Sequence, residues 1–182
     1  FYATTSAGQV HGRRVDGSGD PVVLLHRTPV SSTGFVPVLR FLARAGQAAV
    51  ALDTPGFGES FLPEGAPMTR DYGQWLLEAL DALGIGRFHL AAHHTGTHFA
   101  AEIAAATPGR VASLTLSGIL LAPAAERPGL RADIGHAPAI DAAGAYVTET
   151  FRLMKSLFVD PVPELVHAEP MGALAAGRGR AL

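Results

Sequence analysis

The sequence predicts an α/β fold, with a mostly parallel sheet that carries helices on both faces. Two observations predict it: short apolar runs alternate with helical segments, and the connections between them are short. The composition agrees, because 48% of the 182 residues are hydrophobic and only 16% are charged. A chain of this length and composition can bury one substantial core.

Four apolar runs have the character of buried strands. Residues 22–25 form a continuous run of valine and leucine, as expected for a strand that is covered on both faces. Residues 48–52, 88–92 and 111–117 are predicted to be the other three. A loosely alternating stretch at residues 10–15 precedes them, and it predicts a short edge strand.

Helical patterns fill the intervals between these strands. We expect helices at residues 35–45, 69–83 and 95–106, the first ending before Gly46 and the second before Gly84. Aromatic residues at helical spacing in these segments are expected in the core: Phe41, Trp75 and Phe99.

After the fourth buried strand the alternation of strand and helix stops. A proline-containing stretch leads to two further expected helices, at residues 144–159 and 161–176. We therefore divide the chain into a core at residues 1–120 and a helical lid or cap at residues 121–182.

Polar residues follow three of the predicted strands. The carboxyl ends of parallel strands meet at one rim of a sheet, which is where ligands bind in this fold class. Sequence order alone therefore gathers His26, Thr28, Asp53, His94 and Thr95 on one rim.

Three motifs lie in these loops, and together they resemble the α/β-hydrolase family. His-Arg-Thr-Pro at residues 26–29 resembles the family's His-Gly-x-Pro loop. Asp-Thr-Pro-Gly-Phe-Gly-Glu-Ser at residues 53–60 resembles its Asp-x-Pro-Gly-x-Gly-x-Ser loop. Ala-His-His-Thr-Gly at residues 92–96 resembles its nucleophile elbow, Gly-x-Ser-x-Gly. The resemblance covers roughly residues 10–120.

The chain departs from the family pattern in three ways. Arg27 replaces a glycine of the oxyanion loop, and His94 replaces the nucleophilic serine. The family also places two further strands after the lid, which carry the catalytic acid and histidine. The sequence stops at Leu182 with neither strand, so we expect the chain to be incomplete.

The resemblance implies where the chemistry lies. The backbone N–H groups of Thr28 and Thr95 take the oxyanion-hole positions, which need no particular side chain. His94 takes the catalytic position, as a general base, a nucleophile or a substrate partner. The alternative is that the turn has kept the shape of the elbow while the site has lost its catalytic activity. We expect the dipole of the following helix to lower the pKa of His94.

Five further residues are supporting or substrate-binding candidates. His26 is expected to support loop geometry, and His93 to pack behind the turn. Asp53 is either an acid partner or a brace of its loop, and Arg27 is suited to hold a substrate carboxylate. His98 shares a helical face with His94, so a metal site with Asp53 or His26 is an alternative. We expect no metal and no cofactor.

Two acidic residues after the fourth strand complete the candidates. Glu126 and Asp133 lie where some members of the family keep their acid. Their proline-containing setting favours a position on the surface of the lid instead.

Composition limits the partners. The net charge of −2 gives no electrostatic footprint for nucleic acid. No apolar run approaches the roughly 20 residues that span a bilayer, so no membrane partner is expected. The chain has no cysteine, which excludes disulfides and thiolate metal sites and fits a cytoplasmic protein. A homodimer that pairs apolar lids stays open.

The leading hypothesis is an enzyme that hydrolyses a small, partly apolar carbonyl compound such as an ester or lactone. A second hypothesis is a non-catalytic protein that binds a small molecule in the same pocket. A lyase or a cofactor-free oxygen-using enzyme is a third, which rests on analogy of fold alone.

Overall fold

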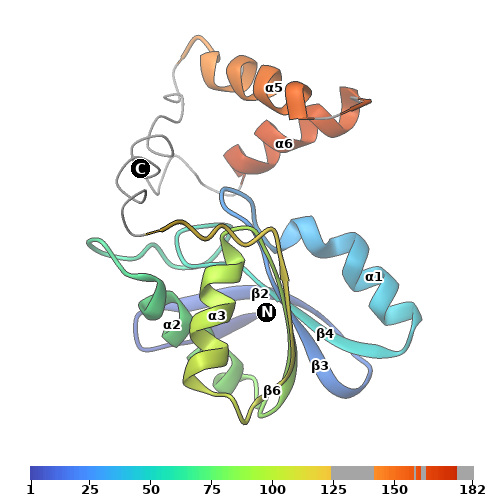
Figure 1. Cartoon of the computed structure of the whole chain (residues 1–182), viewed down its shortest axis with the longest axis vertical. Coiled ribbons are helices and arrows are strands. Elements are labelled where there is room, and N and C mark those ends of the chain that lie inside the picture. The colour runs from blue at the N-terminus through green and yellow to red at the C-terminus, as the bar shows by residue number, and fades with distance from the viewer. Residues whose placement is uncertain (124–141, 158, 161–162, 176–182) are drawn as a thin grey trace.

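The computed structural model describes residues 1–123, 142–157, 159–160 and 163–175 (Figure 1). Its centre is a six-stranded sheet in the order β1-β2-β4-β3-β5-β6. The strands are β1 (Tyr2–Thr4), β2 (Gln9–Val15), β3 (Ser18–Leu25), β4 (Gln47–Leu52), β5 (Phe88–His93) and β6 (Val111–Ser117).

All five predicted strands are confirmed, and the sheet is mostly parallel as predicted. β4, β3, β5 and β6 run parallel, whereas β2 pairs antiparallel with β4. The prediction of β2 as the edge was wrong, because β1 pairs with it and forms the edge itself. A strand of three residues is too short to show an alternating pattern in the sequence.

The register brings the ends of the parallel strands level. Leu25 at the end of β3 pairs with Leu52 of β4 and with Ala92 of β5. The three polar loops therefore leave the sheet side by side, which confirms the single rim predicted from the order of the motifs.

Helices cover both faces of the sheet. They are α1 (Val36–Arg44), α2 (Thr69–Ala82), α3 (Gly96–Ala106), α5 (Ala145–Leu157) and α6 (Pro163–Ala175), and the 3₁₀ helix η1 (Ser32–Phe35) leads into α1. All five predicted helices are present. Figure 1 shows α1 on one side of the sheet and α2 with α3 on the other.

Most of the buried core lies on the α2–α3 side. Leu25, Leu52, Leu90, Phe99 and Ile103 belong to a single apolar cluster there, together with the buried face of α2. A smaller cluster under α1 includes Leu24, Leu39, Ala49 and Ala51. Burying each large apolar side chain of this kind contributes about 1.5–3 kcal/mol.

The expected core positions of the three helical aromatic residues are only partly correct. Phe99 is buried and Trp75 is half-buried, with its ring edge-on to Phe61 at 5.2 Å between centroids. The prediction for Phe41 is wrong, because 70% of this residue is exposed. It follows the buried Leu39 by two positions, and this step of about 200° puts it on the outer side of α1.

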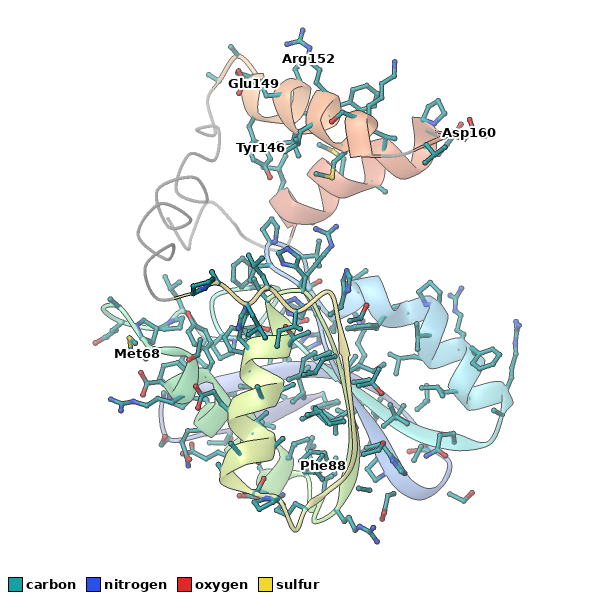
Figure 2. All side chains as sticks on the ribbon, viewed as in Figure 1. Met68, Phe88, Tyr146, Glu149, Arg152 and Asp160 are labelled. Carbon is teal, nitrogen blue, oxygen red and sulfur yellow. The ribbon has the colours of Figure 1, made fainter. Side chains whose placement is uncertain are left out.

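The helices α5 and α6 pack on each other beyond the carboxyl ends of the strands. Tyr146 of α5 and Val166 of α6 are buried. Figure 2 shows Phe88, the first residue of β5, at the end of the sheet farthest from this helix pair, so the polar rim faces α5 and α6. Glu126 and Asp133 lie outside the described residues. None of the described helices is long and apolar enough to cross a membrane.

Candidate active site

The turn between β5 and α3 holds His94 in an uncommon backbone conformation. Its φ of 51° lies in the left-handed region, which costs a residue with a side chain about 1–2 kcal/mol. Three hydrogen bonds fix it there. The His94 N–H donates to the carbonyl of Ser117 at 2.8 Å, and the His94 carbonyl accepts from the N–H and the hydroxyl of Thr97. The surrounding structure therefore imposes this conformation on His94.

Gly96 lets α3 start directly against the end of β3. A Cβ at this position would lie 2.5 Å from the carbonyl oxygen of Leu25 and 2.7 Å from that of His26. Both are backbone atoms, which cannot swing aside. The glycine of the motif is thus required by a close approach of two backbones.

Thr95 connects the turn to the loop after β3. Its hydroxyl accepts a hydrogen bond from the backbone N–H of Thr28 at 2.6 Å. The resemblance assigns this same N–H to a substrate oxyanion. In this structure, the side chain of Thr95 occupies that donor.

His26 joins the loop after β3 to the loop after β4. Its Nδ1 donates to the carbonyl of Arg27 at 2.8 Å, so its Nε2 is free to accept from the N–H of Thr54, also at 2.8 Å. The ring is buried, and this desolvation lowers its pKa. His26 is therefore a neutral ring that holds two loops together.

Asp53 is buried and has three hydrogen-bond donors. The N–H groups of Ser32 and Glu59 donate to its carboxylate at 2.6 and 3.1 Å, and Nδ1 of His11 at 2.7 Å. Desolvation favours the protonated carboxyl, but the hydrogen bonds from Ser32, His11 and Glu59 outweigh it and lower the pKa of Asp53. These contacts make Asp53 the brace of its loop.

His11 was not singled out from the sequence. It is buried on β2, and its backbone N–H donates to the hydroxyl of Ser60 at 2.9 Å. The only signal was a histidine between Val10 and Gly12 in a predicted strand. Its partner, Asp53, lies 42 residues further along the chain, and no local pattern gives that pairing.

His93 lies on the open side of β5 and was expected to pack behind the turn. It is exposed, with its Nδ1 3.3 Å from the hydroxyl of Ser117 on β6. Strand alternation puts it on the face opposite Ala92, which is buried. On that face the helix α1 packs chiefly on β4 and β2.

His94 lies near Arg27 and near two other histidines, His93 and His98. Partial burial lowers its pKa, and the charges of His93, Arg27 and His98 lower it further. The pKa of His94 is lowered, as expected, but the causes are desolvation and like charge and not the dipole of the following helix. The ring of His94 is therefore neutral at pH 7, because its pKa lies below the usual value of about 6.5.

The histidines that the structure describes do not assemble into a metal site. Within the described ranges, no group of three or more His, Cys, Asp or Glu side chains could hold a metal ion. The ring centroids of His93 and His94 lie 6.3 Å apart. Asp53 and His26, either of which would supply the third ligand, accept hydrogen bonds from backbone N–H groups of the loops instead.

A cavity of about 450 Å³ opens between the polar rim and α6. It brings together four of the candidates, His26, Arg27, Asp53 and His93. Thr28, His94, Thr95 and His98 do not line it. The other lining residues are Arg13, Val30, Ser31, Thr33, Gly34, Phe35, Gly58, Glu59, Ala168, Gly172 and Ala175.

Comparison with known sequences gives both the family and the reach of the match. The family model described as the alpha/beta hydrolase fold matches residues 20–140. A protein assigned as a non-heme haloperoxidase in Mycobacterium phage D29 is 35% identical over 142 residues, 78% of this chain and 46% of the phage protein. A 2-hydroxy-6-oxononadienedioate/2-hydroxy-6-oxononatrienedioate hydrolase of Burkholderia vietnamiensis is 33% identical over 114 residues, 60% of this chain and 40% of that enzyme. The chain thus spans less than half the length of these relatives.

Solved structures agree on the fold. Cfl2 of Burkholderia cenocepacia is 27% identical with a TM-score of 0.64, over 93% of this chain and 54% of Cfl2. A thermophilic esterase of Thermogutta terrifontis, with malate bound, has a TM-score of 0.71 at 24% identity, over 100% of this chain and 71% of the esterase. The family model, the parallel sheet and the three rim motifs lead to one conclusion: the chain belongs to the α/β-hydrolase fold family.

Proposed function

We propose that the protein hydrolyses a small ester or lactone, with His94 as the general base. The observation that carries the proposal is the conformation of His94. Its φ of 51° is held by hydrogen bonds to Ser117 of β6 and from Thr97 of α3. The turn lies between β5 and α3, where the family has its nucleophile elbow. Strain of this kind persists where the surrounding structure imposes it, and it is concentrated at active sites.

The lowered pKa of His94 fits it to accept a proton at neutral pH. In the proposed reaction, the neutral ring takes a proton from water, and the resulting hydroxide attacks the substrate carbonyl. The tetrahedral intermediate then expels the alcohol, which takes the proton back from the imidazolium. This route needs no second base to activate a nucleophile, unlike attack by His94 itself.

The proposed oxyanion hole consists of the backbone N–H groups of Thr28 and Thr95. The Thr28 N–H now donates to the hydroxyl of Thr95, so this hydroxyl has to rotate away when a substrate oxygen arrives. Rotation about one side-chain bond is a small change. Removing one oxyanion donor from other enzymes reduces kcat by about 10²–10³.

We further propose residues 121–182 as a lid over the rim. The support is the packing of α5 on α6 and the presence of Ala168, Gly172 and Ala175 in the wall of the cavity. For location and partners we propose a cytoplasmic protein that acts on a small molecule and does not bind nucleic acid. A homodimer would pair the exposed Leu153 and Met171 of the helix pair.

The occupied Thr28 N–H favours a second candidate function, a non-catalytic binding protein. A site whose oxyanion donor is permanently engaged by Thr95 would bind a ligand without turning it over. This candidate predicts saturable binding of a carbonyl compound with no product released.

Hydrolysis of short p-nitrophenyl esters tests the proposal. We expect His94→Ala to lower kcat/KM by about 10²-fold or more, the usual contribution of a general base. His89→Ala is the matched control, because His89 lies near the start of β5, is hydrogen-bonded to Ser113 and is away from the rim. Equal rates in wild type and His94→Ala would remove His94 from the reaction, and binding without turnover would favour the second candidate.

A further inference from the structure

We propose that Ser117 and His93 form a second reactive site, a serine–histidine pair that takes an acyl group from an activated ester. The site is distinct from the proposed hydrolysis at His94, because a different ring and a hydroxyl carry it. Nδ1 of His93 lies 3.3 Å from the hydroxyl oxygen of Ser117. A nucleophile and its base lie about 2.6–3.2 Å apart in enzymes, and often somewhat farther apart before a substrate binds.

Strand pairing fixes the two side chains beside each other. His93 is the last residue of β5 and Ser117 the last residue of β6, and they are partners in the parallel register. The backbone of the serine is held from the turn as well, because the N–H of His94 donates to the Ser117 carbonyl at 2.8 Å. Beyond it the chain turns at Gly118, whose φ is 68°. The pair is therefore built on rigid strand ends.

The pair adjoins the cavity at the rim. His93 is one of the residues in the cavity wall, and Ser117 meets this wall through its contact with the ring. Both residues are exposed, so a molecule in the cavity can reach the hydroxyl without movement of the chain. The volume of about 450 Å³ suits a small ester.

A second serine–histidine pair lies further back on the same two strands. Nδ1 of His89 lies 2.9 Å from the hydroxyl of Ser113, and these residues are also register partners. They lie nearer the starts of the strands and do not line the cavity. This pair has the same contact without the cavity, so it is an internal control for the reactivity of Ser117.

The ring serves as the base in the proposed acyl transfer. In the tautomer with its proton on Nε2, Nδ1 of His93 takes the hydroxyl proton while Oγ of Ser117 attacks the ester carbonyl. The bond from the carbonyl carbon to the leaving oxygen then breaks, and that oxygen takes the proton from Nδ1. Water, with the ring again as base, hydrolyses the acyl-serine and restores the hydroxyl. Only the ester and water are consumed.

The surroundings of the ring limit the substrate class. Among the described residues no carboxylate bonds to His93. The pair is therefore a dyad, without the acid that orients and stabilises the ring in a Ser-His-Asp triad. Such a pair suits an ester whose leaving group is a weak base, such as a phenolate, and not an amide.

A fluorophosphonate probe tests the site. Oγ of Ser117 displaces fluoride from phosphorus, and the hydroxyl proton passes to His93. Trypsin cleaves after Arg110 and Arg131, so a single peptide carries both Ser113 and Ser117, and its fragment ions locate the label. We expect Ser117 to be labelled about 10-fold faster than Ser113 or more, because the cavity holds the probe beside it.

Variants identify the base. We expect His93→Ala to slow the labelling of Ser117 by about 10²-fold or more, the usual contribution of a general base. We expect the same from His93→Gln, which keeps a polar side chain without the basic ring. His89→Ala is the matched control and should leave the labelling of Ser117 unchanged. Circular dichroism melting confirms that each variant is folded.

Three results would overturn the site: no label at Ser117, equal labelling of Ser113 and Ser117, or full labelling in His93→Gln. Rates with p-nitrophenyl esters separate this site from the proposed function. Hydrolysis that is unchanged in His94→Ala but lost in Ser117→Ala would reject the proposed function and leave this site standing. Hydrolysis that is lost in His94→Ala, with no label at Ser117, would do the reverse.

Discussion

The loop after β4 and the turn after β5 leave the same rim, yet the polar residue at the start of each differs in burial and in hydrogen bonding. In the first, Asp53 is buried and three donors hold it. In the second, His94 is exposed and lies in a strained backbone conformation. The first loop follows the family pattern throughout, whereas the turn departs from it at two positions, the exposed His94 and the buried Ala92. Buried polar networks resist change, because losing one partner leaves the others unsatisfied.

Of the changes considered at the two loops, the loss of Asp53 is expected to have the largest effect on stability. We expect Asp53→Ala to lower the free energy of unfolding by about 3–5 kcal/mol, since it leaves the buried His11 ring and the buried N–H of Ser32 without an acceptor, together with the partly buried N–H of Glu59. Urea denaturation of the two proteins measures the difference. Asp20→Ala is the control, because Asp20 makes only a partly exposed ion pair with Arg87 at 3.5 Å, worth about 1 kcal/mol or less. A similar small loss for both variants would show that the Asp53 network is not what holds the loop.

A smaller effect concerns pH and His26, which joins the two loops. Burial lowers its pKa in the folded protein below the value in the unfolded chain, about 6.5. As the pH falls below about 6.5, the unfolded chain binds a proton that the folded protein does not. Stability is therefore full above this pH and falls below it, by at most about 1.4 kcal/mol per pH unit for this one group.

Unfolding free energies between pH 7.5 and 5 measure this slope. We expect His26→Gln to flatten it, because glutamine does not titrate. His89→Gln changes a partly exposed histidine of β5 and serves as the control. His94 adds a smaller contribution of the same sign, since its pKa is also lowered but it is more exposed. A slope in His26→Gln as steep as in the wild type would show that another group titrates.

The sequence predicted the strands and helices well, but it did not predict the contacts between the loops of the rim. Apolar runs and helical patterns predicted every described element except β1 and the 3₁₀ helix η1, and the level ends of β3, β4 and β5 followed from parallel order. The contacts within the rim could not be predicted, because they join distant residues. His11 reaches Asp53 across 42 residues and Thr95 reaches Thr28 across 67. The exposure of His93 was missed for a related reason, since it depends on what covers β5 and not on the local pattern.

The smallest effect tests the strain at the turn, and its direction is the opposite of the others. We expect His94→Gly to raise the free energy of unfolding by about 1 kcal/mol, because glycine adopts a φ of 51° without a steric cost. His94→Ala keeps the Cβ and thus the strain, so it separates relief of the backbone from loss of the imidazole. If the two variants are equally stable, the turn stores no strain. If glycine alone is more stable and both variants lose esterase activity, stability has been given up at this residue for function, as the comparison of the two loops implies.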